Sequence, residues 1–218
     1  MKVFMLFTPL LFALTTRGQG RISITQLDLK TLPKGINYEG KIKNAVRWKD
    51  NSGDNIVITS ETGNYLNKKV VHENEGVDAE LFAYHFLFIN DSAVQTWKVR
   101  DYIFDCPVDI TAKFVKNAFQ VTDLNNDGVA EIWLMYKTVC HGDVSPFNMK
   151  IIMYQGQQKY AMRGQNKVSE GTDEKGFEHF LGGEYTYDPA FANGPKEFLA
   201  FAKKLWEKNI MENWEEER

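Results

Sequence analysis

Oxygen-bearing side chains recur at regular positions in one short loop of the sequence. The loop runs from Asp123 to Glu131, and its first, third, fifth and ninth positions hold Asp123, Asn125, Asp127 and Glu131. Ca²⁺ takes about six to eight hard oxygen ligands at flexible geometry, so these side chains supply much of a coordination shell. A backbone carbonyl near Val129 adds another oxygen. The sequence therefore predicts one calcium site in this loop.

The flanks of the loop decide which kind of calcium site it resembles. An EF-hand places a bidentate glutamate at its twelfth position, which is Leu134 here, and the flanking residues are strand-like rather than helical. The loop instead resembles the calcium hairpin of FG-GAP and VCBS repeats, in which the acid at position nine is a ligand between two antiparallel strands. Gly128 permits the sharp turn. The alternative is a solvated turn, which uses the same Asn, Asp and Gly residues.

The best candidate for a second copy of the loop is the segment 50–55. It lacks a glycine at the sixth position, which is Asn55, and it places Ile58 at the ninth. A propeller of four-stranded blades also needs more chain than 218 residues provide. We therefore expect a single calcium hairpin in a compact sheet domain.

Strand patterns surround this loop and must position it. Short β-rich segments separated by Gly, Asn and Asp clusters extend from Asn44 to Tyr160. Segment 81–89 is apolar on both alternating faces, so it is expected to be a buried strand. Short connections exclude parallel crossovers and predict a mainly β, antiparallel sheet or meander. The predicted strands are 45–48, 56–59, 81–89, 94–104, 110–114, 119–122, 132–139, 150–154 and 160–162.

The pattern changes to a helical period at the C-terminus. From Pro195 the apolar residues recur at 3.6-residue spacing, which predicts an amphipathic helix over 195–214 packed on the sheet. Its polar face is mixed in charge and is followed by acidic residues 215–217, which argues against a membrane-surface helix. Residues 19–218 are thus predicted to form one β-rich domain.

The N-terminus has the pattern of an export signal. Lys2 precedes an apolar run from Val3 to Leu14, which is too short to span a bilayer. Thr16 and Gly18 are small residues at the −3 and −1 positions of a cleavage site. We predict a signal peptide over 1–18, export to the periplasm or cell surface, and no transmembrane segment in the mature protein. The alternative is a buried core helix.

Two cysteines, Cys106 and Cys140, are the only ones in the chain. In an oxidising compartment a single disulfide between them is the expected outcome, worth roughly 3 to 4 kcal/mol by chain entropy. The competing prediction is zinc. It is disfavoured because the cysteines and the scattered histidines lack paired ligand spacings.

Enzyme signatures are absent from the sequence. It has no G-x-S-x-G elbow, H-E-x-x-H pair or Gly-rich phosphate loop. A glycan hydrolase that uses paired carboxylates stays open, because Asp105, Asp109 and Asp143 lie near the cysteines in sequence. The net charge of −3 argues against a nucleic-acid partner.

Several sequence segments, one of which contains the loop, resemble one family. They include the segments 78–85, 105–107, 121–131, 140–146, 149–154, 160–164 and 204–206. They are similar to a family of small exported proteins of Bacteroidota described as surface polysaccharide (lipopolysaccharide) biosynthesis proteins. The resemblance implies a role in envelope glycan assembly, with an envelope glycan or envelope protein as partner, and brings no catalytic residues. We therefore expect an exported, non-catalytic calcium-binding protein, with the periplasmic glycan hydrolase as the alternative.

Overall fold

The computed structural model describes residues 22–212, so the predicted signal peptide at 1–18 lies outside the described residues. The chain is mainly β, with 53% of the described residues in strands and 10% in helices, and its sheets are antiparallel, which confirms the predicted fold class. The elements in chain order are β1 (Thr25–Gln26), β2 (Lys41–Asp50), β3 (Gly53–Tyr65), β4 (Val77–Ile89), β5 (Ser92–Cys106), β6 (Ile110–Phe114), β7 (Gln120–Thr122), β8 (Glu131–Cys140), β9 (Asn148–Gln155), β10 (Gln158–Gln165), β11 (Lys167–Thr172), β12 (Glu178–Gly182), β13 (Tyr185–Tyr187), α1 (Pro189–Asn193) and α2 (Lys196–Asn209).

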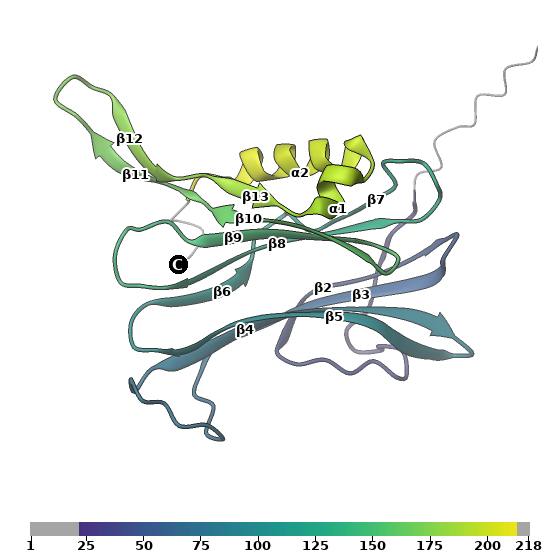
Figure 1. Cartoon of the computed structure of the whole chain (residues 1–218). Coiled ribbons are helices and arrows are strands. Elements are labelled where there is room, and N and C mark those ends of the chain that lie inside the picture. The colour runs from purple at the N-terminus through teal and green to yellow at the C-terminus, as the bar shows by residue number, and fades with distance from the viewer. Residues whose placement is uncertain (1–21, 213–218) are drawn as a thin grey trace, which may run out of the picture.

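Two sheets are stacked face to face (Figure 1). The first is a meander in the order β1-β2-β3-β4-β5, and the second has the order β13-β10-β9-β8-β6, with the short β7 also paired to β8. The inner faces of both sheets contribute to one core, in which Trp48, Leu81 and Val99 of the first sheet meet Ile132 and Leu134 of the second. The main core therefore lies between the sheets, as in a β-sandwich.

Strand β4 is apolar on both faces because both faces are covered. Leu81 and Ala83 point into the inter-sheet core. Phe82 and Tyr84 lie on the outer face of the first sheet, under apolar residues of the N-terminal segment such as Leu27. The prediction that segment 81–89 is a buried strand is confirmed, since β4 lies between β3 and β5 and its residues from Ala79 to Phe86 are almost fully buried.

Helix α2 covers the outer face of the second sheet (Figure 1). Phe198 and Trp206 on its apolar face pack with Trp133 and Met153 of that sheet in a second core. The predicted helix over 195–214 is too long. The helix ends at Asn209, because the following backbone pairs with Lys167.

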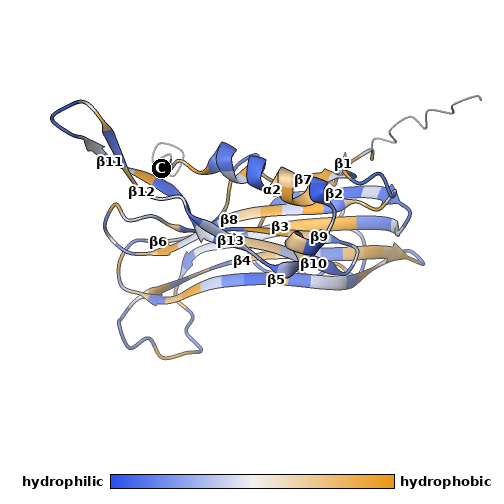
Figure 2. Ribbon diagram, turned by 45° about the horizontal axis from the view of Figure 1, so that its top comes forward, coloured by the Kyte–Doolittle hydropathy of each residue, from blue (hydrophilic) through white to orange (hydrophobic). Residues whose placement is uncertain are grey.

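A separate two-stranded hairpin, β11–β12, projects from the body of the protein (Figures 1 and 2). Most of its residues are exposed and its tip is hydrophilic, as Figure 2 shows. Within residues 22–212 no helix is both long enough and apolar enough to cross a membrane.

Candidate functional site

The predicted calcium loop connects β7 to β8 at one end of the second sheet. Asp123, Asn125 and Asp127 lie in the connection, and Glu131 is the first residue of β8. The loop is tightened by its own side chains, since Asp127 Oδ1 accepts from the Val129 N–H at 2.8 Å and Asp123 Oδ2 accepts from the Gly128 N–H at 3.2 Å. Gly128 has a φ of 79°, the left-handed region that favours glycine. The predicted hairpin geometry is therefore present.

Gln155, at the end of β9, brings three of the predicted oxygen ligands together. Its Nε2 lies 2.9 Å from Asp127 Oδ2, 3.4 Å from Asn125 Oδ1 and 3.4 Å from the Val129 carbonyl oxygen. Three oxygens thus face one positively polarised group. A cation attracts the same atoms by the same electrostatics.

The other two predicted ligands are more deeply placed. Glu131 is fully buried, and its carboxylate accepts from the Thr122 hydroxyl at 2.7 Å and from the Leu124 N–H at 2.9 Å. Burial raises the pKa of Glu131, these hydrogen bonds oppose the rise, and the nearby Asp123 and Asp127 carboxylates add to it. Asp123 Oδ1 is buried and accepts no hydrogen bond from the described residues. The loop therefore concentrates negative charge that is only partly compensated.

The turn between β2 and β3, considered above as a second copy of the loop, lies directly against it. The Asn51 backbone N–H donates to the Gly128 carbonyl at 2.8 Å, and the Asn51 side chain donates to the Asp127 carbonyl at 2.9 Å. Asp50 Oδ2 accepts from the Ala130 N–H at 3.0 Å. Burial of Asp50 favours its neutral form, but hydrogen bonds led by the one from Ser52 outweigh this and lower its pKa. The turn thus fastens the loop of the second sheet to the first.

The loop's oxygen atoms suit a hard cation, but the carboxylates are not gathered into a closed metal cluster. In the described part of the chain, no three Asp, Glu, His or Cys side chains form a group that could hold a metal ion. What the loop presents is a mixed set, with one side-chain amide oxygen, one backbone carbonyl and three carboxylates of which one has an unpartnered oxygen. Such mixed oxygen sets are typical of calcium rather than zinc. Calcium stays a prediction.

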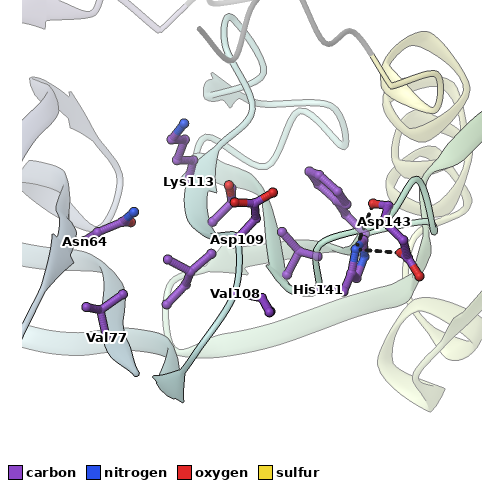
Figure 3. Close-up of a pocket in the computed structure, with 11 residues that line it drawn as sticks. Asn64, Val77, Val108, Asp109, Lys113, His141 and Asp143 are labelled. Carbon is purple, nitrogen blue, oxygen red and sulfur yellow. Dashed lines mark hydrogen bonds and ion pairs between the residues drawn. The ribbon is translucent and has the colours of Figure 1, made fainter. Parts of the chain in front are cut away.

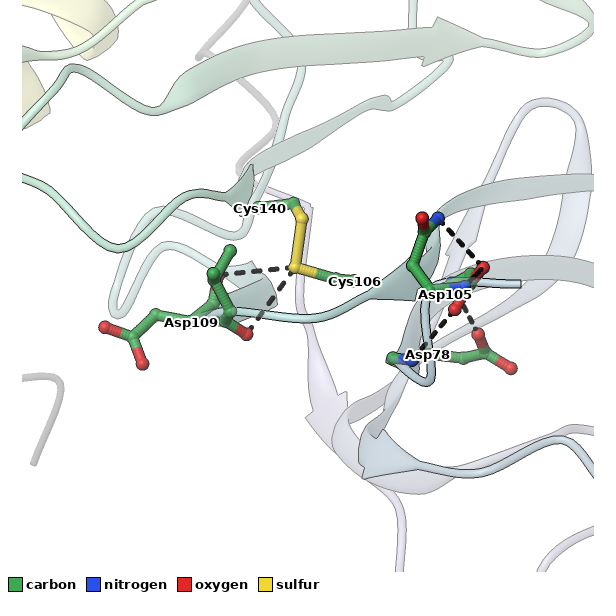
Figure 4. The surroundings of a disulfide bond; sticks show 8 residues. Asp78, Asp105, Cys106, Asp109 and Cys140 are labelled. Carbon is green, nitrogen blue, oxygen red and sulfur yellow. Dashed lines mark hydrogen bonds between the residues drawn. A yellow bond between two sulfur atoms is a disulfide. The ribbon is translucent and has the colours of Figure 1, made fainter. Parts of the chain in front are cut away.

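The predicted disulfide is present at the opposite end of β8. Cys106, the last residue of β5, bonds to Cys140, the last residue of β8, with the Cα atoms 5.8 Å apart. Figure 4 shows this bond and its surroundings. It joins the first sheet to the second.

The three acids of the alternative hydrolase prediction do not form one site. Asp105 and Asp109 lie on opposite sides of the disulfide (Figure 4). Asp105 is 7% exposed, and its carboxylate accepts from the backbone N–H groups of Asn74 and Gly76, both at 2.9 Å. Although burial alone would raise the pKa of Asp105, these hydrogen bonds lower it. Asp105 therefore anchors the loop that precedes β4.

Asp109 and Asp143 do line a common cavity of about 370 Å³, shown in Figure 3. His141 lines it too, and its Nδ1 lies 3.0 Å from Asp143 Oδ1. His141 Nε2 is buried and has no hydrogen-bond partner in the region described. Hydrogen bonds from Ser145 lower the pKa of Asp143, whereas the general acid of a glycosidase needs a raised pKa. The cavity thus holds two of the three acids, and Asp105 lies outside it.

Neither a protein-family model nor a curated protein or solved structure matches this chain.

Three residues at the loop were missed by the sequence argument. Asp50 and Asn51 were considered only as part of a turn and possible second copy of the loop, and their contacts with the Ala130 N–H and the Asp127 carbonyl of the first loop were not foreseen. Gln155 carried no signal beyond its place between the predicted strands 150–154 and 160–162. Its position beside the loop follows from the pairing of β9 with β8, in which Gln155 lies opposite Glu131.

Proposed function

We propose that this protein is an exported, calcium-binding and non-catalytic protein of the cell envelope, acting in surface polysaccharide or lipopolysaccharide biosynthesis or assembly. The signal-like N-terminus and the disulfide support export, because disulfides persist in oxidising compartments. The similarity of several sequence segments to the Bacteroidota family supports the envelope role. An envelope glycan or envelope protein is the proposed partner.

The observation that carries the calcium proposal is the gathering of loop oxygens around Gln155 Nε2, with Asp123 Oδ1 buried and unpartnered nearby in sequence. Calcium would be held by Asp123, Asn125, Asp127, Glu131 and the Val129 carbonyl. The ion supplies positive charge where the carboxylates repel one another. Its role is structural, because the loop fastens the two sheets together through the β2–β3 turn.

Thermal unfolding with and without calcium tests this proposal. Extracellular-type sites have dissociation constants of about 0.1 to 1 mM, so ~1 mM Ca²⁺ should stabilise the wild type by roughly 0.4 to 1.4 kcal/mol over chelator. Asp127→Ala should abolish this increment.

Asp173→Ala is the matched control for that experiment. Asp173 also accepts backbone N–H groups within a turn, from Lys175 and Phe177 at 2.9 Å each, but in the β11–β12 hairpin. Both substitutions remove turn hydrogen bonds, and only Asp127→Ala should remove the response to calcium. If the melting temperature of the wild type is the same with calcium and with chelator, the calcium site is refuted.

The non-catalytic role has a separate test in the source organism. Deletion of the gene should alter the surface polysaccharide profile, and Asp109→Ala or Asp143→Ala should restore it as well as the wild type does. A glycosidase that loses either carboxylate loses typically orders of magnitude in rate. Failure of one folded and exported Asp variant, together with turnover of envelope glycan by the wild type, would favour the hydrolase instead.

A further inference from the structure

A cationic cavity of about 310 Å³ lies where the edge strand of the first sheet passes the second sheet. Strand β5 is the edge of the first sheet, and it runs below β9 and β10 in Figure 1. The residues that line the cavity are Lys98, Val99, Arg100, Asp101, Tyr136, Lys150, Ile152, Lys159 and Arg163. Five of them are cations and one is an acid.

Strand register puts three of these cations on one face of the second sheet. Arg163 of β10 is directly opposite Lys150 of β9, so their side chains share a face. Lys159 is four residues before Arg163 on the same strand and therefore points to the same side. Lys150 is bonded to Asp101 of β5 across the gap between the sheets, which identifies this as the face toward the first sheet.

Asp101 compensates only one of the three charges. It pairs with Lys150 at 2.5 Å, and it also raises the pKa of Tyr136, next to the larger effect of burial. The side chains of Arg163 and Lys159 have no ion pair and no hydrogen bond to any residue between 22 and 212, and both residues are exposed. Lys98 and Arg100 alternate along β5 with Val99, which points into the inter-sheet core, so their charged groups lie on the outer face of the first sheet and pair there with Glu39 and Glu80.

The repulsion among these cations has an energetic cost, of which the Asp101–Lys150 pair offsets only a part. Like charges directly opposite each other on neighbouring strands destabilise a sheet. Arg163 and Lys150 are such a pair, and Lys159 adds a third charge at the same cavity. A ligand with about two negative charges would balance the three cations against the single Asp101 carboxylate.

We propose that this cavity binds a phosphate monoester group, with Arg163, Lys159 and Lys150 as its ligands. A phosphate monoester carries about −1.5 to −2 charges near neutral pH, which matches the excess. The planar guanidinium of Arg163 presents paired donors that suit phosphate oxygens, and the two ammonium groups act as point charges. The site is separate from the calcium loop and does not depend on the proposed function.

Titrations followed by amide chemical shifts test the proposal. The probes are inorganic phosphate, glucose 1-phosphate, glucuronate and glucose, added to the full mature protein at low and at physiological salt. Both phosphates should shift amides of β5, β9 and β10, and glucose should shift none. A higher affinity for glucose 1-phosphate would assign the site to phosphorylated sugars, and equal affinities to the phosphate group alone. Binding of glucuronate as tight as that of phosphate would overturn the phosphate assignment.

Charge-neutral variants identify the residues. Arg163→Gln should weaken phosphate binding at least tenfold and Lys159→Gln at least threefold. Lys68→Gln is the matched control, because Lys68 is an exposed lysine in the loop after β3 and does not line the cavity. If Lys68→Gln weakens binding as much as Lys159→Gln does, or if Arg163→Gln binds phosphate like the wild type, the assignment is wrong.

Melting temperatures show whether a variant loses phosphate binding only because it is less stable. In phosphate-free buffer Arg163→Gln should melt at or above the wild-type temperature, because the substitution removes the repulsion with Lys150. Added phosphate should raise the melting temperature of the wild type and not that of the variant. A lower melting temperature for Arg163→Gln in phosphate-free buffer would show that Arg163 has a structural role and would refute the proposal.

Discussion

Removing the disulfide should lower the stability of the protein by about 4 kcal/mol. The change is the double substitution Cys106→Ala with Cys140→Ala. The two residues are 34 positions apart, and the chain-entropy relation gives about 3.8 kcal/mol for a closed loop of roughly this length. Cys106 is 1% exposed, so its lost sulfur contacts add a small further term. For a domain of roughly this size, each kcal/mol shifts the melting temperature by about 2 to 4 °C, which predicts a fall of about 8 to 16 °C.

Urea denaturation at neutral pH measures this loss and separates its cause. The bond acts mainly on the unfolded chain, so the variant should also unfold with a larger m-value, because its unfolded state is less compact. Wild-type protein under a strong reductant should match the variant. A loss below about 1 kcal/mol would refute the reasoning, since it would mean that the unfolded chain gains little freedom when the bond is removed.

Two further predictions concern the loop and the buried histidine. Gly128→Ala should lower the free energy of unfolding by about 2 kcal/mol, because the backbone there is left-handed and a Cβ would meet Asn51 Nδ2 at 2.1 Å. Gly156 is also left-handed, but a Cβ there would meet nothing within 4 Å, so Gly156→Ala should cost only about half as much. Burial lowers the pKa of His85 to about 4, against a smaller opposing effect of Asp50, so the fold keeps His85 neutral. The contribution of neutral His85 to the free energy of unfolding should therefore be present above pH 6.5 and fall by about 3 kcal/mol as the pH drops toward 4. The difference in unfolding free energy between the wild type and His85→Gln across this range measures that contribution.

The periodic parts of the fold could be predicted because their signals are local. The alternation along 81–89 follows from a strand with two covered faces, and the strand pair around Gly156 follows from the turn residues between β9 and β10. The disulfide followed from the count of cysteines once export was assumed. The C-terminal helix was found from its period, but its end was set by backbone pairing with Lys167, a tertiary contact that no local pattern contains.

The parts that were missed depend on contacts between distant segments. The N-terminal segment covers the outer face of the first sheet through a few isolated apolar residues such as Leu27 and Ile36, which show no period. Strands β11 and β12 bury little, so they lack the apolar alternation that reveals a strand. The pairing of Lys150 with Arg163 is a local feature, because the short turn between β9 and β10 sets the register of the hairpin. That Asp101 of the other sheet meets Lys150 could not be read from the sequence.

Strand β8 is fastened to the first sheet at both of its ends, and the two fastenings should act independently. Its first residue, Glu131, belongs to the loop that binds the β2–β3 turn, and its last, Cys140, carries the disulfide. The strand is 10 residues long, so these two residues at its ends lie about 30 Å apart. Changes so far apart with no shared partner usually add to within about 0.5 kcal/mol. Combining Gly128→Ala with the disulfide-free variant should therefore lose the sum of the two separate losses in urea denaturation. A coupling energy above about 1 kcal/mol would refute this independence, because it would mean that releasing one end of β8 already frees the other.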